Sequence, residues 1–491
     1  MSHFNWFLDG SIVGIYLLVT MAAGVMVRKY VGKVEDFLVA GREMNLFLGI
    51  ASLAATEFGI ITCMYTAQGG YENGFAGATP GILQALAMFF IGITGFCVKP
   101  LRDSGVMTIP ELFEKRYGVF IRWLSGVVIV LGGLLNMGVF LRVGGDFLVQ
   151  VTGMNEGYLV TTMTILLAMV AIYTILGGML SVLVTDFLQF IVMSIGLLAV
   201  TYLIIGKIGW STIVATVEQK HGAGGFNPFL NPRLGFEWVL AQSFLQVAAT
   251  LTWQTTIARL MAAKDTWTGR KVYIGTSFFF VCRFLIPGIW GIAALGALGA
   301  NAPKDTLHAM PMFLSTFVPM GLMGVLIAAM LAADMSTDSS YMITWAAVIY
   351  NDILGPFRKK NGSEKMGLLI NRMLVALIGV FLFFYGLFYQ LEGALWDYLA
   401  ITGTVYLSSM SVLLIACCYW KRANNWGAAA AIVTGAVFPV SYLVLEKVSP
   451  ATLEAIAFNK NRAAICAYVL SAVAMVVFSL IKPQPAAAAQ A

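Results

Sequence analysis

The chain has 491 residues, of which 59% are hydrophobic and only 11% are charged. A soluble domain is about 45–50% apolar and about 25% charged, so this composition excludes an ordinary water-soluble enzyme. The mean hydropathy of +0.84 and the repeated long apolar runs instead predict a polytopic membrane protein. The net charge of +6 does not call for a nucleic-acid partner, because basic residues collect in cytoplasmic loops of membrane proteins.

Apolar runs between polar breaks predict an all-α protein with about 13 transmembrane helices, each needing about 18 or more residues to cross a bilayer. The run 311–352 is too long for one simple span, so we expect it to kink or to extend past the bilayer. The predicted spans cover residues 9–27, 45–70, 75–98, 123–151, 158–177, 181–206, 236–262, 272–299, 311–352, 367–391, 395–418, 425–446 and 463–481.

The basic residues between these spans predict the orientation of the chain. They are dense in alternate loops, for example at Arg28 and Lys29 and again at Arg259 and Lys264. The positive-inside rule places these loops in the cytoplasm, which puts the N-terminus outside and the C-terminus inside. We therefore expect a multi-pass protein of the plasma membrane, which in a bacterium is the inner membrane.

Ionisable residues inside the apolar runs predict a polar pathway or a buried polar network. Such residues are costly in a bilayer and usually face a cavity or a partner. Arg142 and Arg283 are the basic members of this set. Its acidic members are Glu57, Asp146, Asp186, Asp334, Asp338 and Asp397.

The span 45–70 contains the sequence SLAATEFGIITCMYTAQGG, in which Glu57 and Gly59 interrupt an apolar helix near its middle. A helix that unwinds there frees backbone carbonyls, which are tolerated only where they line a cavity or bind an ion. The alternative is a continuous helix with a buried, hydrogen-bonded Glu57.

The span 311–352 carries a hydroxyl-rich face. At about 100° per residue, Asp334 and Asp338 fall on the opposite face. The members of the hydroxyl-rich face are Ala333, Ser336, Thr337, Ser339 and Ser340. Neutral hydroxyls and carbonyls could hold a sodium ion without placing a permanent charge in the bilayer. The alternative is that these hydroxyls bridge helices, as Ser and Thr commonly do in membranes.

Five stretches, in order along residues 9–420, resemble the sodium:solute symporter family, which includes carriers for proline, sugars and sialic acid. One departure is Ala258, which stands where the family usually has Gln. The stretches are VEDFLVAGREM, MTIPELFEKRYG, YTILGGMLSVLVTDFLQFIVM, TTIARLMAAKD and LAADMSTDSS.

This resemblance implies the leucine-transporter fold, in which two inverted repeats of five helices form the core. It also implies that the spans 45–70 and 236–262 are unwound near the bilayer midplane. The expected division has a first span with its loop, the first repeat, the second repeat, and two last spans with a short tail. These parts cover residues 1–44, 45–206, 207–420 and 421–491.

The resemblance further implies a sodium site built from the carbonyls of Ala55, Phe58 and Ala333 and the hydroxyls of Ser336 and Thr337. Some family members have a second sodium site. Here the matching residues are Asp186, Ser336, Ser339 and Ser340. The alternative is that Asp186 is a buried carboxylate partner for these hydroxyls without an ion. The implied cofactor is Na⁺, as one or two coupling ions.

The solute is expected to be a sugar, an amino acid or an organic acid, bound beside the sodium. Arg142 could hold a carboxylate, or it could pair with Asp146 at the i,i+4 spacing. Asp334 and Asp338 stand where the family usually has apolar or small residues, and we expect them to pair with Arg142, Arg283 or water. The candidate solute contacts are Glu57, Gly59, Thr62, Gln84, Asn136, Val139, Arg142, Phe244 and Gln246.

The implied function is sodium-coupled uptake of the solute by alternating access, with the lipid bilayer as surroundings and no obligatory protein partner. The nearest alternative is a proton-coupled carrier of the same fold, with Glu57 or Asp186 as the proton site. A membrane-embedded enzyme is disfavoured because the chain has no HExxH, no GxSxG and no His within an apolar run. A channel is a further alternative, but a channel would not need to occlude an ion and a solute together.

Overall fold

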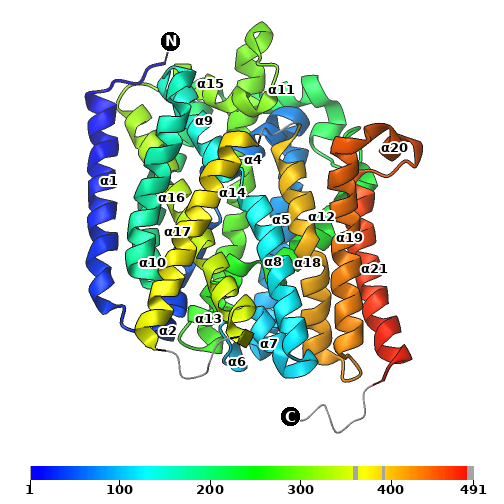
Figure 1. Ribbon diagram of the computed structural model, residues 1–491. Helices are drawn as coiled ribbons and strands as arrows, with labels where there is room; N and C mark the ends of the chain where they lie inside the picture. Colours follow the sequence, from blue (N-terminus) through cyan, green and yellow to red (C-terminus); the bar gives the residue numbers. More distant parts are fainter. Residues whose placement is uncertain (1, 358–362, 390–392, 484–491) are drawn as a thin grey trace.

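The computed structural model describes residues 2–357, 363–389 and 393–483. Within these ranges the chain is helical and forms no β-strand, with only an isolated bridge between Met44 and Ala263. Its long helices lie side by side in one bundle (Figure 1). The prediction of an all-α protein is therefore confirmed.

The structure describes thirteen helices of 13 or more residues, which carry most of the apolar sequence, and twelve of them end before residue 449. They are α1 (Leu8–Met26), α4 (Ile60–Asn73), α5 (Thr79–Thr94), α8 (Val119–Met137), α9 (Phe140–Thr152), α10 (Leu159–Ile208), α12 (Gly235–Thr252), α14 (Thr266–Leu298), α16 (Leu322–Val348), α17 (Glu364–Phe388), α18 (Leu395–Tyr419) and α19 (Asn425–Val448). The last long helix is α21 (Lys460–Ile481). The shorter helices are α2 (Val34–Val39), α3 (Leu46–Thr56), α6 (Val98–Asp103), α7 (Ile109–Tyr117), α11 (Trp210–His221), α13 (Gln254–Ala262), α15 (Ala309–Phe317) and α20 (Pro450–Ala455).

Ten stretches of the described residues are long and apolar enough to cross a membrane. Some of them join two predicted spans: Glu156–Ile208 contains both 158–177 and 181–206. The many membrane-crossing helices are thus confirmed, while the number thirteen stays a prediction. The last residues of the predicted span 367–391 and the end of the predicted tail lie outside the described residues.

Two of the predicted spans are broken inside the bundle. α3 ends at Thr56 and α4 begins at Ile60, with Gly59 extended between them (φ −84°, ψ 173°). α12 and α13 are separated at Trp253, which is also extended (φ −65°, ψ 119°). The discontinuous helices are therefore confirmed, and the alternative of a continuous helix around Glu57 is wrong.

The predicted kink in the run 311–352 is also present. α15 ends at Phe317, and α16 begins at Leu322 directly after Gly321. The φ of Gly321 is +85°, in the left-handed region that favours glycine. A second glycine of this kind, Gly178 (φ +54°), interrupts α10 between the two predicted spans that this element contains.

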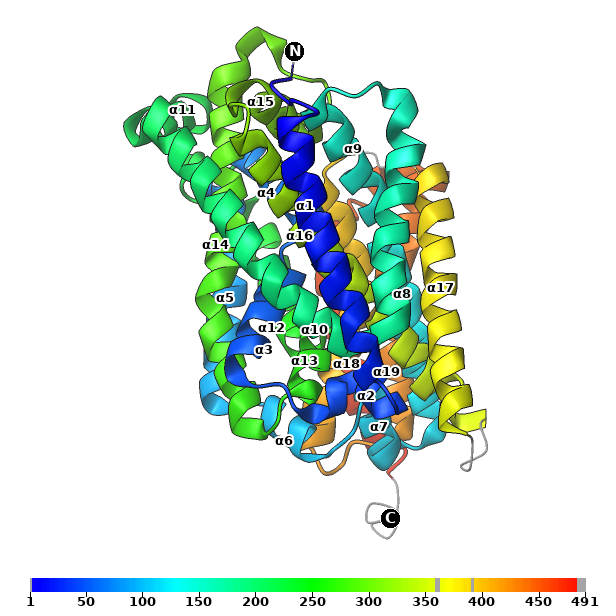
Figure 2. The ribbon, with the colours of Figure 1, turned by 90° about the vertical axis from the view of Figure 1, so that its left-hand side faces the viewer.

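α16 lies at the centre of the bundle, where nearly all of its side chains are buried. α1 lies at the edge against α10 and α16 (Figure 2). α19 and α21 pack against each other at another edge (Figure 1). The first turn of α1 and the last turn of α21 lie at opposite ends of the bundle (Figure 1). Because α16 is central and buried, its polar residues face other helices and not the lipid.

Candidate ion and solute sites

The break between α3 and α4 lies directly against α16. The Thr337 hydroxyl donates hydrogen bonds to the carbonyls of Thr56 (2.8 Å) and Ala333 (3.0 Å). Gly59 makes this approach possible, because a Cβ there would stand 2.8 Å from the Thr337 hydroxyl oxygen. The break thus brings backbone carbonyls of one broken helix to the hydroxyl-rich face of α16.

The residues predicted for the first sodium site meet around this contact. Ala55, Phe58 and Ala333 are fully buried, and the Phe58 N–H donates to the Ala55 carbonyl (3.2 Å). Ser336 is one residue from Thr337, and its hydroxyl oxygen lies 3.4 Å from that of Thr56. Carbonyls of an unwound helix together with neutral hydroxyls are groups that can coordinate a small alkali cation in a membrane protein.

Asp186 of α10 lies beside these residues in a second polar cluster. Its Oδ1 accepts a hydrogen bond from Ser336 (2.6 Å), and its Oδ2 accepts one from Ser52 (2.5 Å). Ser340 reaches the cluster through the Thr56 hydroxyl, at 2.9 Å. Ser339 does not share these bonds, because its hydroxyl donates to the Ser336 carbonyl of its own helix (3.2 Å).

The cluster also contains Arg259, whose sequence-based assignment to a cytoplasmic loop is wrong. Arg259 is fully buried and pairs with Asp186 at 3.0 Å. It lies on α13, which begins inside the bundle directly after the break at Trp253. The local sequence TTIARLMAAKD is polar enough to resemble a loop, and the carboxylate that neutralises Arg259 lies 73 residues away in the chain.

A central cavity of about 70 Å³ adjoins the α3–α4 break, which is room for a few waters or a small solute. Its wall includes Thr56 and Thr337, so the cavity and the hydroxyl–carbonyl contact share the same break. Five of the residues predicted to contact the solute line this cavity: Glu57, Thr62, Gln84, Asn136 and Gln246.

The other four predicted solute contacts lie outside this lining. Gly59 packs its backbone against Thr337, and Val139 is buried in the turn between α8 and α9. Phe244 stacks on Tyr468, with ring centroids 5.6 Å apart. Arg142 pairs with Asp146 at 3.3 Å. This is the i,i+4 ion pair that the sequence offered as the alternative to solute recognition by Arg142.

Glu57 and Arg283 form a buried ion pair in the cavity wall. Glu57 Oε2 lies 3.1 Å from Arg283 Nη1, and Oε1 accepts a hydrogen bond from Thr255 (2.8 Å). Arg283 Nη2 donates to the Tyr65 hydroxyl (2.7 Å). The sequence marks Arg283 as an intramembrane charge, but no local pattern identifies its partner.

The expected pairing of Asp334 and Asp338 with Arg142 or Arg283 is wrong. Both arginines are neutralised by other carboxylates, as described above. Among the described residues neither aspartate forms an ion pair, and Asp338 Oδ1 has no hydrogen-bond partner in that part of the chain.

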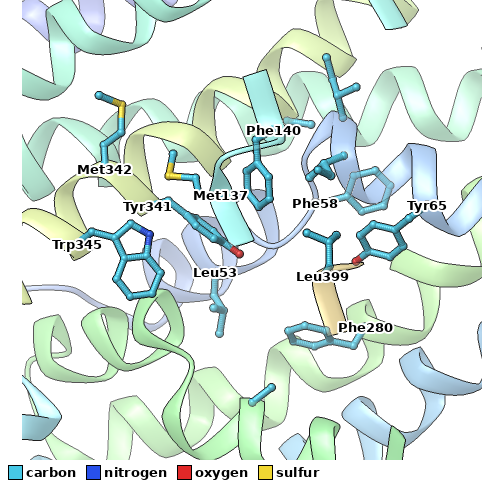
Figure 3. Packing of buried hydrophobic residues seen from close by; sticks show 14 of the residues in the cluster. Leu53, Phe58, Tyr65, Met137, Phe140, Phe280, Tyr341, Met342, Trp345 and Leu399 are labelled. Carbon is cyan, nitrogen blue, oxygen red and sulfur yellow. The ribbon is translucent and has the colours of Figure 1, made fainter. Parts of the chain in front are cut away.

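Aromatic rings enclose the central cavity. Phe140 and Tyr341 lie beside each other, with centroids 5.1 Å apart, and Leu399 lies near them (Figure 3). Tyr65 and Trp396, at 4.9 Å, line both this cavity and a larger one of about 370 Å³. The two rings therefore form part of the partition between the two cavities. Charged residues line the larger cavity: Glu72, Arg233, Asp397 and Lys460.

Comparison with known proteins identifies the family. The family model "Sodium:solute symporter family" matches residues 37–435. The Sodium/glucose cotransporter 4 of Danio rerio is 26% identical over 480 residues, covering 89% of this chain and 72% of that protein. The Osmoregulated proline transporter OpuE of Bacillus subtilis (strain 168) is 23% identical over 497 residues, covering 97% of this chain and 95% of that protein.

A solved structure shows the same fold. A Na⁺-coupled sialic acid symporter in a substrate-bound outward-open state matches with a TM-score of 0.82 at 19% identity. The match covers 98% of this chain and 99% of that one. The leucine-transporter-type fold implied by the motifs is confirmed, as is Na⁺ as coupling ion. The chain belongs to the sodium:solute symporter family, and it is a multi-pass, sodium-coupled transporter of a small solute and not an enzyme.

Proposed function

We propose that the protein carries a small organic solute into the cell, with the solute in the central cavity and Na⁺ at the α3–α4 break. One observation carries this proposal: Thr56 and Thr337, which join the break to α16, also line the cavity. An ion and a solute bound there would share side chains, so each would favour the arrangement that the other needs. This shared wall is the physical basis for coupled transport.

The proposed sodium ligands are the carbonyls of Ala55, Phe58 and Ala333 and the hydroxyls of Ser336 and Thr337. Their burial and the contact of Thr337 with Ala333 support this assignment. A bound Na⁺ would replace the hydrogen bonds that Thr337 now makes to carbonyls. The residues proposed for a second ion are Asp186, Ser336, Ser339 and Ser340. The Arg259 side chain pairs with Asp186 at this place.

The proposed ligands come from both predicted repeats, residues 45–206 and 207–420. Ion binding would therefore tie the first repeat to the second, and rocking of one against the other would expose the site to alternate sides. We place the N-terminus outside and the protein in the plasma membrane. The larger cavity then lies toward the outside, since Arg233 and Lys460 lie in the loops after the predicted spans 181–206 and 425–446, which this orientation puts outside. Each sodium entering gains about 2.3 kcal/mol per 100 mV of membrane potential.

The cavity wall supports a solute with several polar groups. The Gln84, Asn136 and Gln246 amides offer both donors and acceptors, and the Glu57–Arg283 pair adds one charge of each sign. Such a wall suits a sugar, an amino acid or an organic acid. Proteoliposomes with an inward sodium gradient, tested with D-glucose, L-proline and sialic acid, are expected to take up one of these classes.

Choline in place of sodium, at fixed pH, is expected to abolish this uptake. Uptake that persists in choline and follows a pH gradient would instead support the proton-coupled alternative, with Glu57 or Asp186 as the proton site. No uptake of any solute in the panel, despite sodium-dependent thermal stabilisation, would place the substrate outside these three compounds.

We predict that Thr337→Ala weakens sodium binding about tenfold or more, which corresponds to about 1.4 kcal/mol. The substitution removes one proposed ligand and leaves the hydrogen bonds of Asp186 in place. The measurement is the sodium concentration that gives half-maximal thermal stabilisation of the purified protein, with choline keeping the ionic strength constant.

Thr344→Ala is the matched control for Thr337→Ala. Thr344 is also a buried threonine of α16, but its hydroxyl donates to the Ser340 carbonyl of the same helix (2.6 Å). We expect this variant to keep the sodium affinity of the unmodified protein. Equal affinities for the two variants would refute the assignment of Thr337 as a ligand.

A further inference from the structure

We propose that Cys97 and Cys418 form a reversible redox site, at which hydrogen peroxide joins the two thiols in a disulfide that ties two helices together at the inner end of the bundle. Formation of this disulfide does not depend on the proposed function. Its effect on transport rests on that function, because transport requires one repeat to rock against the other.

The two cysteines lie far apart in the chain but at the same end of the bundle. Cys97 lies in the turn between α5 and α6, and Cys418 lies in the last turn of α18. α6 lies at the same end as the last turn of α21 (Figure 1), which is the inner end in the proposed orientation. Cys97 belongs to the first predicted repeat and Cys418 to the second.

Three contacts hold the two segments against each other. The Cys97 backbone N–H donates to the Tyr419 hydroxyl (2.9 Å). The Phe96 and Tyr419 rings stack, with centroids 5.0 Å apart and an angle of 8° between their planes. The Cys97 thiol donates a hydrogen bond to the Cys418 sulfur. Since two of these contacts involve no sulfur, the packing of the segments itself places the thiols next to each other.

Cys417 is adjacent to Cys418 in the chain but points elsewhere. Successive residues of an α-helix are about 100° apart around its axis, so the two side chains face different directions. Only Cys418 shares a hydrogen bond with the Cys97 thiol. Cys97 is fully buried and Cys418 is half-buried, so a small oxidant reaches Cys418 first.

The backbone at Cys97 is a second sign that the thiol has a role. Its φ is +58°, in the left-handed region, where residues with a Cβ are uncommon and glycine fits without strain. Residues held in such conformations cluster at functional sites. The turn therefore keeps a thiol at a position where glycine would be the more stable choice for the backbone.

The oxidation balances in two steps. Hydrogen peroxide transfers one oxygen to the Cys418 sulfur: the O–O bond breaks, a sulfenic acid forms and a water leaves. The Cys97 sulfur then attacks the sulfenic sulfur, so that the S–S bond forms and the S–O bond breaks. The hydroxyl group leaves with the Cys97 proton as a second water. The two thiols lose two electrons in total and the peroxide gains them, and a dithiol reductant such as dithiothreitol restores the thiols.

The disulfide would link the two repeats covalently at their inner ends. α5 and α18 could then no longer separate there, so the rocking that opens the inner side would be blocked. The proposed sodium site at the α3–α4 break would keep all its ligands. Because the cytosol keeps exposed thiols reduced, such a bond forms there only under oxidising conditions.

The test treats the purified full-length protein with hydrogen peroxide, alkylates the remaining thiols in denaturant, and identifies cross-linked peptides by mass spectrometry without reductant. We expect a linked pair that contains Cys97 and Cys418 and that disappears with dithiothreitol. Cys97→Gly suits the positive φ and is expected to form no such link. Cys417→Ser is the matched control, because it keeps both thiols, and is expected to form the link.

Uptake is measured in proteoliposomes prepared from the same samples. In the unmodified protein, peroxide is expected to lower sodium-driven uptake about tenfold, because alternating access requires the inner ends to separate. Dithiothreitol should restore the uptake, and Cys97→Gly should keep its uptake in peroxide. If Cys97→Gly does not fold, Cys418→Ser takes its place.

The absence of a link between Cys97 and Cys418 in the treated protein would overturn the redox site, as would a link from Cys97 to Cys417. A link without loss of uptake, or an equal loss in Cys97→Gly, would overturn the effect on transport. If the untreated protein takes up no solute of the panel, the proposed function fails separately, and the cross-link still decides the redox site.

Discussion

Glu57→Gln is expected to lower the free energy of unfolding by about 3–5 kcal/mol, the usual cost of leaving one member of a buried ion pair uncompensated. Glu57 and Arg283 lie 3.1 Å apart, with side chains only 3% and 11% exposed. After the substitution, Arg283 would keep the Tyr65 hydroxyl, which carries no charge. Denaturant titration of the purified protein in mixed micelles measures the loss.

A double-mutant cycle separates the pair from the two single residues. Arg283→Gln should also be destabilising, whereas Glu57→Gln/Arg283→Gln should cost less than the sum of the two. Glu237→Gln is the matched control, because it breaks an exposed pair with Arg462 (2.8 Å) and should cost less than about 1 kcal/mol. Additive losses in the double variant would show that the two charges do not stabilise each other.

The same variants indicate whether the pair also serves transport. Both residues line the central cavity, so the double variant removes two groups that could orient a solute. We expect it to regain much of the stability while sodium-driven uptake stays low. If the double variant recovers both stability and sodium-driven uptake, the pair has a structural role only.

Local patterns marked Glu57 and Gly59 as a possible break and identified the hydroxyl-rich face of α16, and the family resemblance then favoured the break over a continuous helix. Both features depend on residues that are neighbours in the sequence, so composition and helical spacing determine them. The partner of Arg283 could not be predicted in this way, because Glu57 is 226 residues away in the chain. Arg259 was missed for the same reason, since its carboxylate lies on another helix.

Two candidate solute contacts, Val139 and Arg142, lie outside the lining of the central cavity. α8 ends at Met137 and α9 begins at Phe140, so the regular helical rotation is interrupted between them. Asn136 lines the cavity before this interruption, whereas Arg142 follows it and turns to Asp146. Phe140, which also follows the turn, lines the cavity together with Asn136, so the ion pair with Asp146 and not the turn alone accounts for the position of Arg142.

The contact between α4 and α14 predicts the second large effect, on substitution of Gly291. A Cβ at Gly291 would stand 1.9 Å from the Ala67 carbonyl oxygen and 2.7 Å from its carbon. Those atoms belong to the backbone, so one helix has to move to admit a methyl group. Overpacking usually costs about 1–3 kcal/mol, and we expect Gly291→Ala to reach or exceed the upper end of that range.

The displacement should also affect the cavity, because α14 carries Arg283 and α4 carries its partner Tyr65. Gly288→Ala is the matched control on the same helix, since the nearest atom to its Cβ, the Thr66 carbonyl oxygen, is 3.8 Å away. We expect Gly288→Ala to change the free energy of unfolding by no more than about 0.5 kcal/mol. Similar losses for the two variants in the same titration would contradict a close backbone contact at Gly291, and with it the helix spacing that holds Arg283 against Glu57.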